Sequence, residues 1–267
     1  HNGRNSHSSL MSDGAVPVAP SAVPSTIPAL TRDFQLAPTE IPRALETFEV
    51  APIISTFRQA ALNAIEAGFD GVELQAANSH LIEQFLEDGT NARTDAYGGS
   101  KENRARFLLD IVDEVAAAIG ADRLGVRLSP FGQYGGIHDS NPLDLFTFVI
   151  GELSKRRIAY LHLIEARGSE IGLSDELHEN ARNNAELFRS VFDGPLFSAG
   201  AYTPEGAAET LEKKHADAIA FGRLFIANPD LVERVRENYP LNPPDRSTFY
   251  GGGAHGYTDY EAYRDAA

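Results

Sequence analysis

The chain has 267 residues, 42% of them hydrophobic and 23% charged, which is enough to bury one large core or two modest ones. Its 38 acidic residues against 23 Lys and Arg give a formal charge of −15, which disfavours nucleic acid as a partner because such binders need a basic stripe. The absence of cysteine excludes disulfides, thiolate zinc sites and a cysteine nucleophile, and it fits a reducing compartment.

Two kinds of segment are expected within a single domain over residues 1–267. Residues 1–50 hold most of the prolines and little apolar periodicity, so they are expected to form a Pro-rich loop segment. Residues 51–267 are expected to form helix-and-strand units and a C-terminal tail. The first helix is predicted to begin at a Ser55 cap and to end at Gly68, and a strand is predicted over residues 71–74.

The same order of helix and strand repeats along the rest of the chain. Thr203 followed by Pro204 is typical of a helix start, with Pro at the first helical position. Asn228, Pro229 and Asp230 repeat this pattern before a closing helix. The other predicted pairs are helix 100–120 with strand 124–128, helix 142–155 with strand 160–164, helix 184–192 with strand 195–198, and the Thr203 helix with strand 218–221.

Strands that alternate with helices predict a parallel sheet, because parallel neighbours need a crossover connection. An open dinucleotide-binding sheet would show a Gly-rich turn after a strand, and no G-x-G-x-x-G follows any strand here. We therefore expect an α/β fold of the TIM (β/α)₈ barrel type. Only five strands are convincing, so the first strands of the barrel are expected to be absent from this chain.

The ends of the last two predicted strands indicate a phosphate site. The penultimate strand runs into Ala199 and Gly200, and the last runs into Gly222 and Arg223. In such barrels phosphate sites are built from these loops, where Gly permits close backbone approach and Arg can grip the oxygens. Each Gly alone has the simpler explanation of a turn residue, but two at successive strand ends favour the phosphate site.

Arg127 lies inside a predicted strand, where a charge is costly unless it is paired or holds a ligand. The residues alone leave two alternatives open, a planar cofactor and an Arg that meets a carboxylate or the surface. His1, His7 and His162 have no partners at ligand spacing, so no metal site is expected. No apolar run approaches the roughly 18 residues of a spanning helix and no leader opens the chain, so a cytoplasmic protein with no membrane partner is expected.

Together these motifs resemble the old yellow enzyme family of FMN-dependent ene-reductases over nearly the whole chain. The resemblance implies a TIM barrel that binds FMN, takes hydride from NADPH or NADH, and reduces a small-molecule alkene with an electron-withdrawing group. A Lys placed for a Schiff base at a strand end, as in an aldolase, is not found. The resembling runs are HNGR at 1–4, GFDGVEL at 68–74, QFL at 84–86, NARTDAYGGS at 91–100, ENRARF at 102–107, GVRLSP at 125–130, FGR at 221–223, NPD at 228–230, TFY at 248–250 and GYTDY at 256–260.

The resemblance assigns roles to individual positions. Arg127 falls where the family places an Arg against the flavin pyrimidine edge. Ala199, Gly200, Gly222 and Arg223 fall at the strand ends that hold the FMN phosphate. Tyr250 resembles an aromatic wall of the substrate pocket, and its alternative role is that of a core aromatic residue.

The catalytic motif departs from the family pattern, in which a His, an Asn or His, and a Tyr follow the first of these strands. This chain has Gln75, Asn78 and His80 there. Gln75 and Asn78 can still donate hydrogen bonds to a substrate carbonyl, and His80 can donate a proton near neutral pH. We therefore expect altered or weaker reductase activity, and the alternative is a homologue that binds flavin without useful turnover.

A second departure concerns the start of the chain. In the family, the first barrel strands precede the segment that His1 to Arg4 resembles, and His1 is not a Met. The sequence thus predicts a cut or processed chain. It is expected to be a fragment, one piece of a split or rearranged flavoprotein that a second chain completes, or a truncated product that folds poorly.

Overall fold

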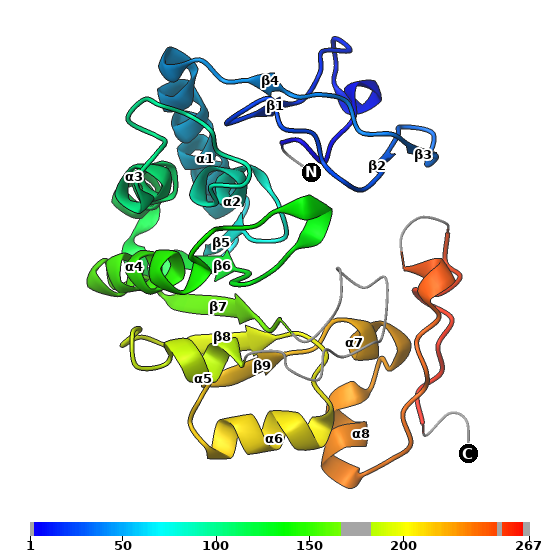
Figure 1. Cartoon of the computed structure of the whole chain (residues 1–267). Coiled ribbons are helices and arrows are strands. Elements are labelled where there is room, and N and C mark those ends of the chain that lie inside the picture. The colour runs from blue at the N-terminus through cyan, green and yellow to red at the C-terminus, as the bar shows by residue number, and fades with distance from the viewer. Residues whose placement is uncertain (1–2, 167–182, 250–252, 264–267) are drawn as a thin grey trace.

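Five parallel strands form the central sheet of the molecule. A computed structural model describes residues 3–166, 183–249 and 253–263 (Figure 1). The sheet order is β5-β6-β7-β8-β9, so each strand pairs with its neighbour in sequence and all the pairs are parallel. This one-directional order is that of a barrel wall and differs from a doubly wound sheet, whose order reverses. The strands are β5 (Val72–Ala76), β6 (Leu124–Leu128), β7 (Tyr160–Ile164), β8 (Leu196–Ala199) and β9 (Ala218–Ala220).

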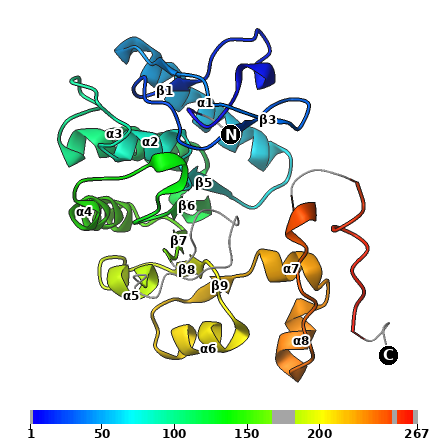
Figure 2. The ribbon, with the colours of Figure 1, turned by 45° about the vertical axis from the view of Figure 1, so that its right-hand side comes forward.

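The helices that connect these strands cover one face of the sheet (Figure 2). Within the described ranges, none of the helices is long and apolar enough to cross a membrane.

The helices are α1 (Thr47–Glu66), α2 (Leu81–Leu86), α3 (Lys101–Ile119), α4 (Pro142–Lys155), α5 (Asn184–Phe188), α6 (Pro204–Glu212), α7 (Arg223–Ala227) and α8 (Leu231–Glu237), with 3₁₀ turns η1 (Ser8–Leu10), η2 (Ala121–Arg123), η3 (Tyr134–Gly136) and η4 (Arg246–Thr248).

Local signals set several of these boundaries at the predicted residue or within one residue of it. The Ser100 hydroxyl accepts a hydrogen bond from the Asn103 N–H and caps α3, and Gly120 ends that helix with φ +96°. The Thr203 hydroxyl accepts a hydrogen bond from the Gly206 N–H at 3.1 Å and caps α6. The bounds of α4, β6 and β7 are those expected from the sequence.

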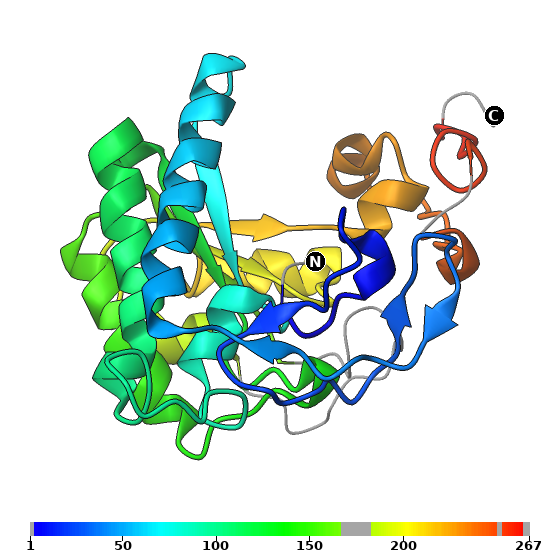
Figure 3. The ribbon, with the colours of Figure 1, turned by 90° about the horizontal axis from the view of Figure 1, so that it is seen from above.

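The start of α1 was predicted wrongly. The helix begins at Thr47, eight residues before the expected Ser55 cap, and it contains Pro52. The Glu49 carboxylate accepts a hydrogen bond from the Glu46 N–H at 2.8 Å, which satisfies a donor at the new start. Pro52 lacks the N–H that would bond to an earlier turn, and the burial of Val50 and Ile54 in the first turns of α1 offsets this loss. Figure 3 shows α1 and α3 side by side.

Other boundaries moved by one to four residues, and the helices α2 and α7 were missed. Strand β5 begins and ends later than residues 71–74, and β8 shifts by one residue. Strand β9 ends one residue early, and α5 stops at Phe188 instead of residue 192. Helix α2 was missed because it has only six residues and all of them are buried, Glu83 and Gln84 included, so it lacks the apolar and polar faces of a surface helix.

The hydrophobic core lies between the sheet and the helices. Alternate strand residues, such as Leu74, Val126 and Leu161, face the helices and pack against buried aromatic residues such as Phe107 and Phe146. Because strand side chains alternate between faces, the residues between these positions point to the opposite face. That face lies inside the curve of a barrel wall.

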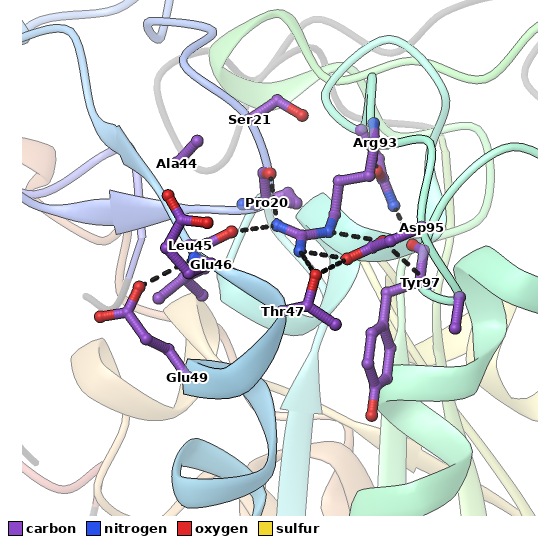
Figure 4. A network of polar contacts seen from close by, with 12 residues as sticks. Pro20, Ser21, Ala44, Leu45, Glu46, Thr47, Glu49, Arg93, Asp95 and Tyr97 are labelled. Atoms are coloured by element: carbon purple, nitrogen blue, oxygen red, sulfur yellow. Dashed lines mark hydrogen bonds and ion pairs between the residues drawn. The ribbon is translucent and has the colours of Figure 1, made fainter.

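Arg93 ties the N-terminal segment to this framework (Figure 4). Its guanidinium donates to the carbonyl of Pro20 at 3.1 Å and to the carbonyl of Leu45, and it pairs with the Asp95 carboxylate. Asp95 in turn accepts from the Thr47 hydroxyl at 2.5 Å. Besides η1, the regular elements of residues 3–46 are two-residue strands: β1 (Val18–Ala19) pairs with β4 (Arg43–Ala44), and β2 (Ala29–Leu30) pairs with β3 (Leu36–Ala37).

Candidate active site

Three polar side chains stand in one row across adjacent strands. Gln75 on β5 is the register partner of Arg127 on β6, and Arg127 is the register partner of His162 on β7. All three belong to the face opposite the core, near the carboxyl ends of their strands. This end of a parallel barrel is where active sites lie.

Each member of the row has a buried polar atom without a hydrogen-bond partner in the described structure. These atoms are Oε1 of Gln75, Nε of Arg127 and Nε2 of His162. A buried polar atom left unsatisfied costs about 1–3 kcal/mol, so such atoms are rare in a folded protein. Three in adjacent register positions indicate a place for a polar ligand.

Glu73 supplies the charge that balances this row. Its Oε2 lies 2.9 Å from Nδ1 of His162. Burial favours the neutral acid, but the hydrogen bond from His162 and the charge of Arg127 together hold the pKa of Glu73 below its usual value. Burial lowers the pKa of Arg127, and the charge of Glu73 opposes that shift. Glu73 therefore faces Arg127 as a counter-charge while Arg127 Nε stays unpartnered.

A stacked aromatic pair, Tyr160 and Phe197, lies beside the row. Burial, with the nearby Glu73 carboxylate, raises the pKa of Tyr160 to about 12, so its hydroxyl stays protonated. The Tyr160 ring stacks on Phe197 with ring centroids 4.5 Å apart. Tyr160 lies two residues before His162 on β7, and Phe197 on β8 is the register partner of His162, so this pair borders the row at β7 and β8.

The other two expected catalytic residues lie in the loop from β5 to α2. Asn78 is half-buried with φ +56°, and its N–H donates to the Ser129 hydroxyl at 2.8 Å. His80 precedes α2, and its Nδ1 lies 2.9 Å from the Ala77 carbonyl. Burial lowers the pKa of His80, with a further lowering from the charge of Arg127. The fold thus brings Gln75, Asn78 and His80 to the same end of the sheet as Arg127.

The expected phosphate-binding residues lie side by side where β8 and β9 end. Ala199 and Ala220 are register partners, so the chain leaves both strands at the same edge. Gly200 has φ +122°, and an added Cβ would lie 3.1 Å from the Glu165 carbonyl oxygen. Gly222 faces open space, and Arg223 follows it as the first residue of α7. Tyr250, expected in the substrate pocket, lies outside the described residues.

Glu165 organises the end of β7 and was missed in the sequence. Its buried carboxylate accepts hydrogen bonds from the N–H groups of Asn184 and Ala185 at 2.6 and 3.0 Å, and from the Ser198 and Tyr202 hydroxyls at 2.7 and 3.2 Å. It joins the start of α5 to the loop that carries Gly200. An acidic residue directly after an apolar strand was the available signal.

Glu83 and Ser129 were also missed, and they contact the loop that carries Asn78. Glu83 lies on α2 and is fully buried. The Ser129 hydroxyl, just past β6, donates to Oε1 of Glu83. Their separation of 46 residues in the chain leaves no local signal for this pair.

Comparison with known proteins gives the family of this chain. The profile of the NADH:flavin oxidoreductase / NADH oxidase family matches residues 1–242. A putative 12-oxophytodienoate reductase 10 from Oryza sativa subsp. japonica is 44% identical over 256 residues, covering 95% of this chain and 80% of the relative. The 12-oxophytodienoate reductase 7 of the same plant is 42% identical over 272 residues, covering 97% and 69%.

Two solved structures superpose on nearly the whole chain. Morphinone reductase superposes with a TM-score of 0.91 at 46% identity, covering all of this chain and 71% of that one. The old yellow enzyme homologue from Zymomonas mobilis superposes with a TM-score of 0.89 at 39% identity, covering 98% and 72%. The chain therefore belongs to the NADH:flavin oxidoreductase / NADH oxidase family.

The family assignment confirms three expectations drawn from the sequence. The resemblance to old yellow enzymes is confirmed, and so is the α/β fold of the TIM-barrel type. FMN with a nicotinamide hydride donor is confirmed as the cofactor pair at the level of the family. The chain is accordingly an oxidoreductase by family.

Proposed function

We propose that this chain is an FMN-dependent NAD(P)H ene-reductase that reduces the C=C bond of a small alkene carrying an electron-withdrawing group. The observation that carries the proposal is the row of unpartnered buried atoms on Gln75, Arg127 and His162. They lie at the end of the sheet where Gly200, Gly222 and Arg223 also gather. A ligand with a polar ring edge at one end and a phosphate at the other fits both groups of residues.

Arg127 would hold the ring edge of the cofactor, and Ala199, Gly200, Gly222 and Arg223 would hold its phosphate. Arg127 stays cationic at neutral pH and has Nε available to donate a hydrogen bond. The open space beside Gly222 leaves room for a ligand that any larger side chain would fill. When bound, FMN supplies the hydride that is passed to the alkene.

Gln75 and Asn78 would bind and polarise the substrate carbonyl through their side-chain amides. A neutral amide stabilises developing negative charge less than an imidazolium does, so we expect weaker turnover on ordinary enones than with a histidine at position 75. His80 would donate the proton. Because burial lowers its pKa below 6.5, its protonated fraction, and with it turnover, should increase as the pH falls below neutrality. Tyr250 is proposed as the aromatic wall of the pocket.

One observation favours a second candidate, in which the chain binds FMN only when another polypeptide adds strands. Within the described sheet, β5 and β9 each have one paired side, so two strand edges stay open. Open edges of a parallel sheet invite further pairing. This candidate predicts weak FMN retention by the chain alone.

A visible absorption spectrum tests the first candidate against the second. The purified chain is titrated with FMN and then with a phenol, followed by an alkene assay with NADH or NADPH. A flavin band that stays with the protein through gel filtration and shifts with the phenol supports the reductase. A colourless protein after gel filtration supports the second candidate.

A further inference from the structure

The loop that carries Asn78 has a costly backbone conformation. Asn78 and Ser79 are consecutive non-glycine residues with φ +56° and +57°. The left-handed region costs an ordinary residue about 1–2 kcal/mol, although Asn tolerates it better. Such a pair persists only where surrounding contacts fix it, and strained backbone of this kind gathers at functional sites.

Two buried side chains supply those contacts. The Glu83 carboxylate accepts a hydrogen bond from the Ser79 N–H through Oε2 and one from the Ser129 hydroxyl through Oε1. The Ser129 oxygen accepts a hydrogen bond from the Asn78 N–H at 2.8 Å. The N–H groups of both left-handed residues, Asn78 and Ser79, are therefore bound by Glu83 and Ser129, which are themselves hydrogen-bonded to each other.

The carbonyl side of Ser79 is held separately. The Ser79 carbonyl accepts hydrogen bonds from Nε2 of Gln84 at 2.7 Å and Nδ2 of Asn5 at 3.1 Å. Loss of the Glu83 and Ser129 contacts would thus free the N–H side of the loop while these two anchors remain. A local change at Asn78, and not loss of the fold, is the expected consequence.

We propose that Glu83 and Ser129 are positioning residues for the substrate-binding site, because they fix the backbone from which the Asn78 amide projects. The inference rests on the proposed function, in which Asn78 binds the substrate carbonyl. Neither residue need touch substrate or cofactor. Their effect should appear in carbonyl-ligand binding and leave FMN binding unchanged, since Arg127 and the β8 and β9 loops hold FMN.

The first test measures the loop without flavin. Hydrogen–deuterium exchange of the segment 77–80 is compared among the wild type, Ser129→Ala and Glu83→Gln. Loss of one hydrogen bond should speed exchange there by about threefold to tenfold. Ser129→Thr keeps the hydroxyl and should restore protection. Glu87→Gln is the matched control, since Glu87 is also buried and its side chain makes no hydrogen bond to this loop within the described residues.

The second test measures the site with FMN bound. Ser129→Ala and Glu83→Gln should weaken phenol binding about threefold to tenfold and raise KM for the alkene, with the FMN Kd unchanged. Adding Ser79→Gly to Ser129→Ala should recover part of the loss, because Gly adopts the left-handed region readily. If Glu83→Gln does not fold, Ser129→Ala carries both tests.

The outcomes separate the inference from the proposed function. Wild-type protein that binds FMN and phenol, with both variants equal to it in exchange and phenol affinity, overturns the positioning role and leaves the reductase proposal standing. Wild-type protein that binds no FMN or phenol overturns the reductase proposal, and with it the substrate-binding part of the inference. The exchange experiment then still decides whether Glu83 and Ser129 hold the loop.

Discussion

The carboxylate of Glu73 on β5 reaches His162 on β7, with Oε2 2.9 Å from Nδ1, across the intervening strand β6. Gly125 lies between them in register with Glu73, and a Cβ there would lie 2.3 Å from the Tyr160 ring. The absence of a side chain at Gly125 therefore makes room for the Tyr160 ring. The Glu73 carboxylate places a negative charge near Arg127 without a hydrogen bond to the Arg127 Nε.

Replacement of Arg127 should weaken FMN binding directly. Hydrogen bonds that involve a charged group contribute about 1.5–3 kcal/mol, so Arg127→Met should raise the FMN Kd by roughly tenfold to 150-fold. Quenching of FMN fluorescence on titration gives the Kd. Arg123→Met, an exposed Arg at the other end of β6, is the control. An unchanged Kd in Arg127→Met would remove Arg127 from the cofactor site.

Substitution of Gln75 by His should strengthen carbonyl-ligand binding. A charged donor makes a hydrogen bond about 1 kcal/mol stronger than a neutral amide does, so Gln75→His should tighten phenol binding roughly fivefold and raise turnover. The absorbance change of FMN-loaded protein on phenol titration measures this. Gln59→His, on the exposed face of α1, should have no effect. Equal phenol affinity in Gln75→His and wild type would contradict the role of position 75.

Ser79→Gly should stabilise the protein. Ser79 is fully buried with a left-handed backbone, and its hydroxyl has no hydrogen-bond partner in the described structure. Gly removes both costs, against a smaller loss from the freer unfolded chain, so a net gain of about 1 kcal/mol is expected. Urea unfolding gives the value. Ser6→Gly, at a buried Ser outside the left-handed region, should destabilise instead; a loss in Ser79→Gly would refute the strain argument.

Arg93→Ala should destabilise the attachment of the N-terminal segment. The Arg93 side chain is 8% exposed, and its guanidinium donates to the Pro20 and Leu45 carbonyls as well as to the Asp95 carboxylate. Removing a buried charge with its hydrogen bonds costs roughly 3–5 kcal/mol. Thermal and urea unfolding measure the loss. Arg43→Ala breaks a surface ion pair with Glu49 and should change stability little, and equal effects of the two variants would show that Arg93 has no special role.

The stability of the protein should depend on pH through Glu83. Burial raises the pKa of its carboxyl from 4.5 to about 7, opposed by the Ser129 and Ser79 hydrogen bonds and by Arg4. Because the native state binds this proton more tightly than the unfolded chain, Glu83 lowers stability as pH rises from about 4.5 to 7.

Glu83→Gln removes that ionisation, so its stability relative to the wild type should improve between these pH values. Urea unfolding at pH 4.5 and pH 8 measures the change. Glu87, whose pKa is also raised by burial and by the charge of Glu83, titrates nearby, so Glu87→Gln is measured in parallel. A constant difference between Glu83→Gln and the wild type across this range would contradict the raised pKa.

Sequence reasoning predicted the features of this protein that short stretches of chain decide. The Thr203 cap, the bounds of α4, β6 and β7, and the ends of α3 to within one residue follow from local hydrogen bonds and apolar periodicity. The motif runs indicated the family, and with it the barrel fold and the cofactors. Gln75, Asn78 and Arg127 were predicted as site residues from their positions in the motif runs, and their roles stay predictions.

What the tertiary structure alone decided are relationships between residues far apart in the chain. Helix α2 is buried on every side, α1 begins before its Pro52, and Glu73 meets His162 across β6. Glu83, Ser129 and Asn78 form one unit from three segments. Amino-acid periodicity reports which face of an element is apolar, but it carries no information on which distant group satisfies a buried carboxylate. The sequence therefore determined the elements and the family, and packing decided the partners that shape the candidate site.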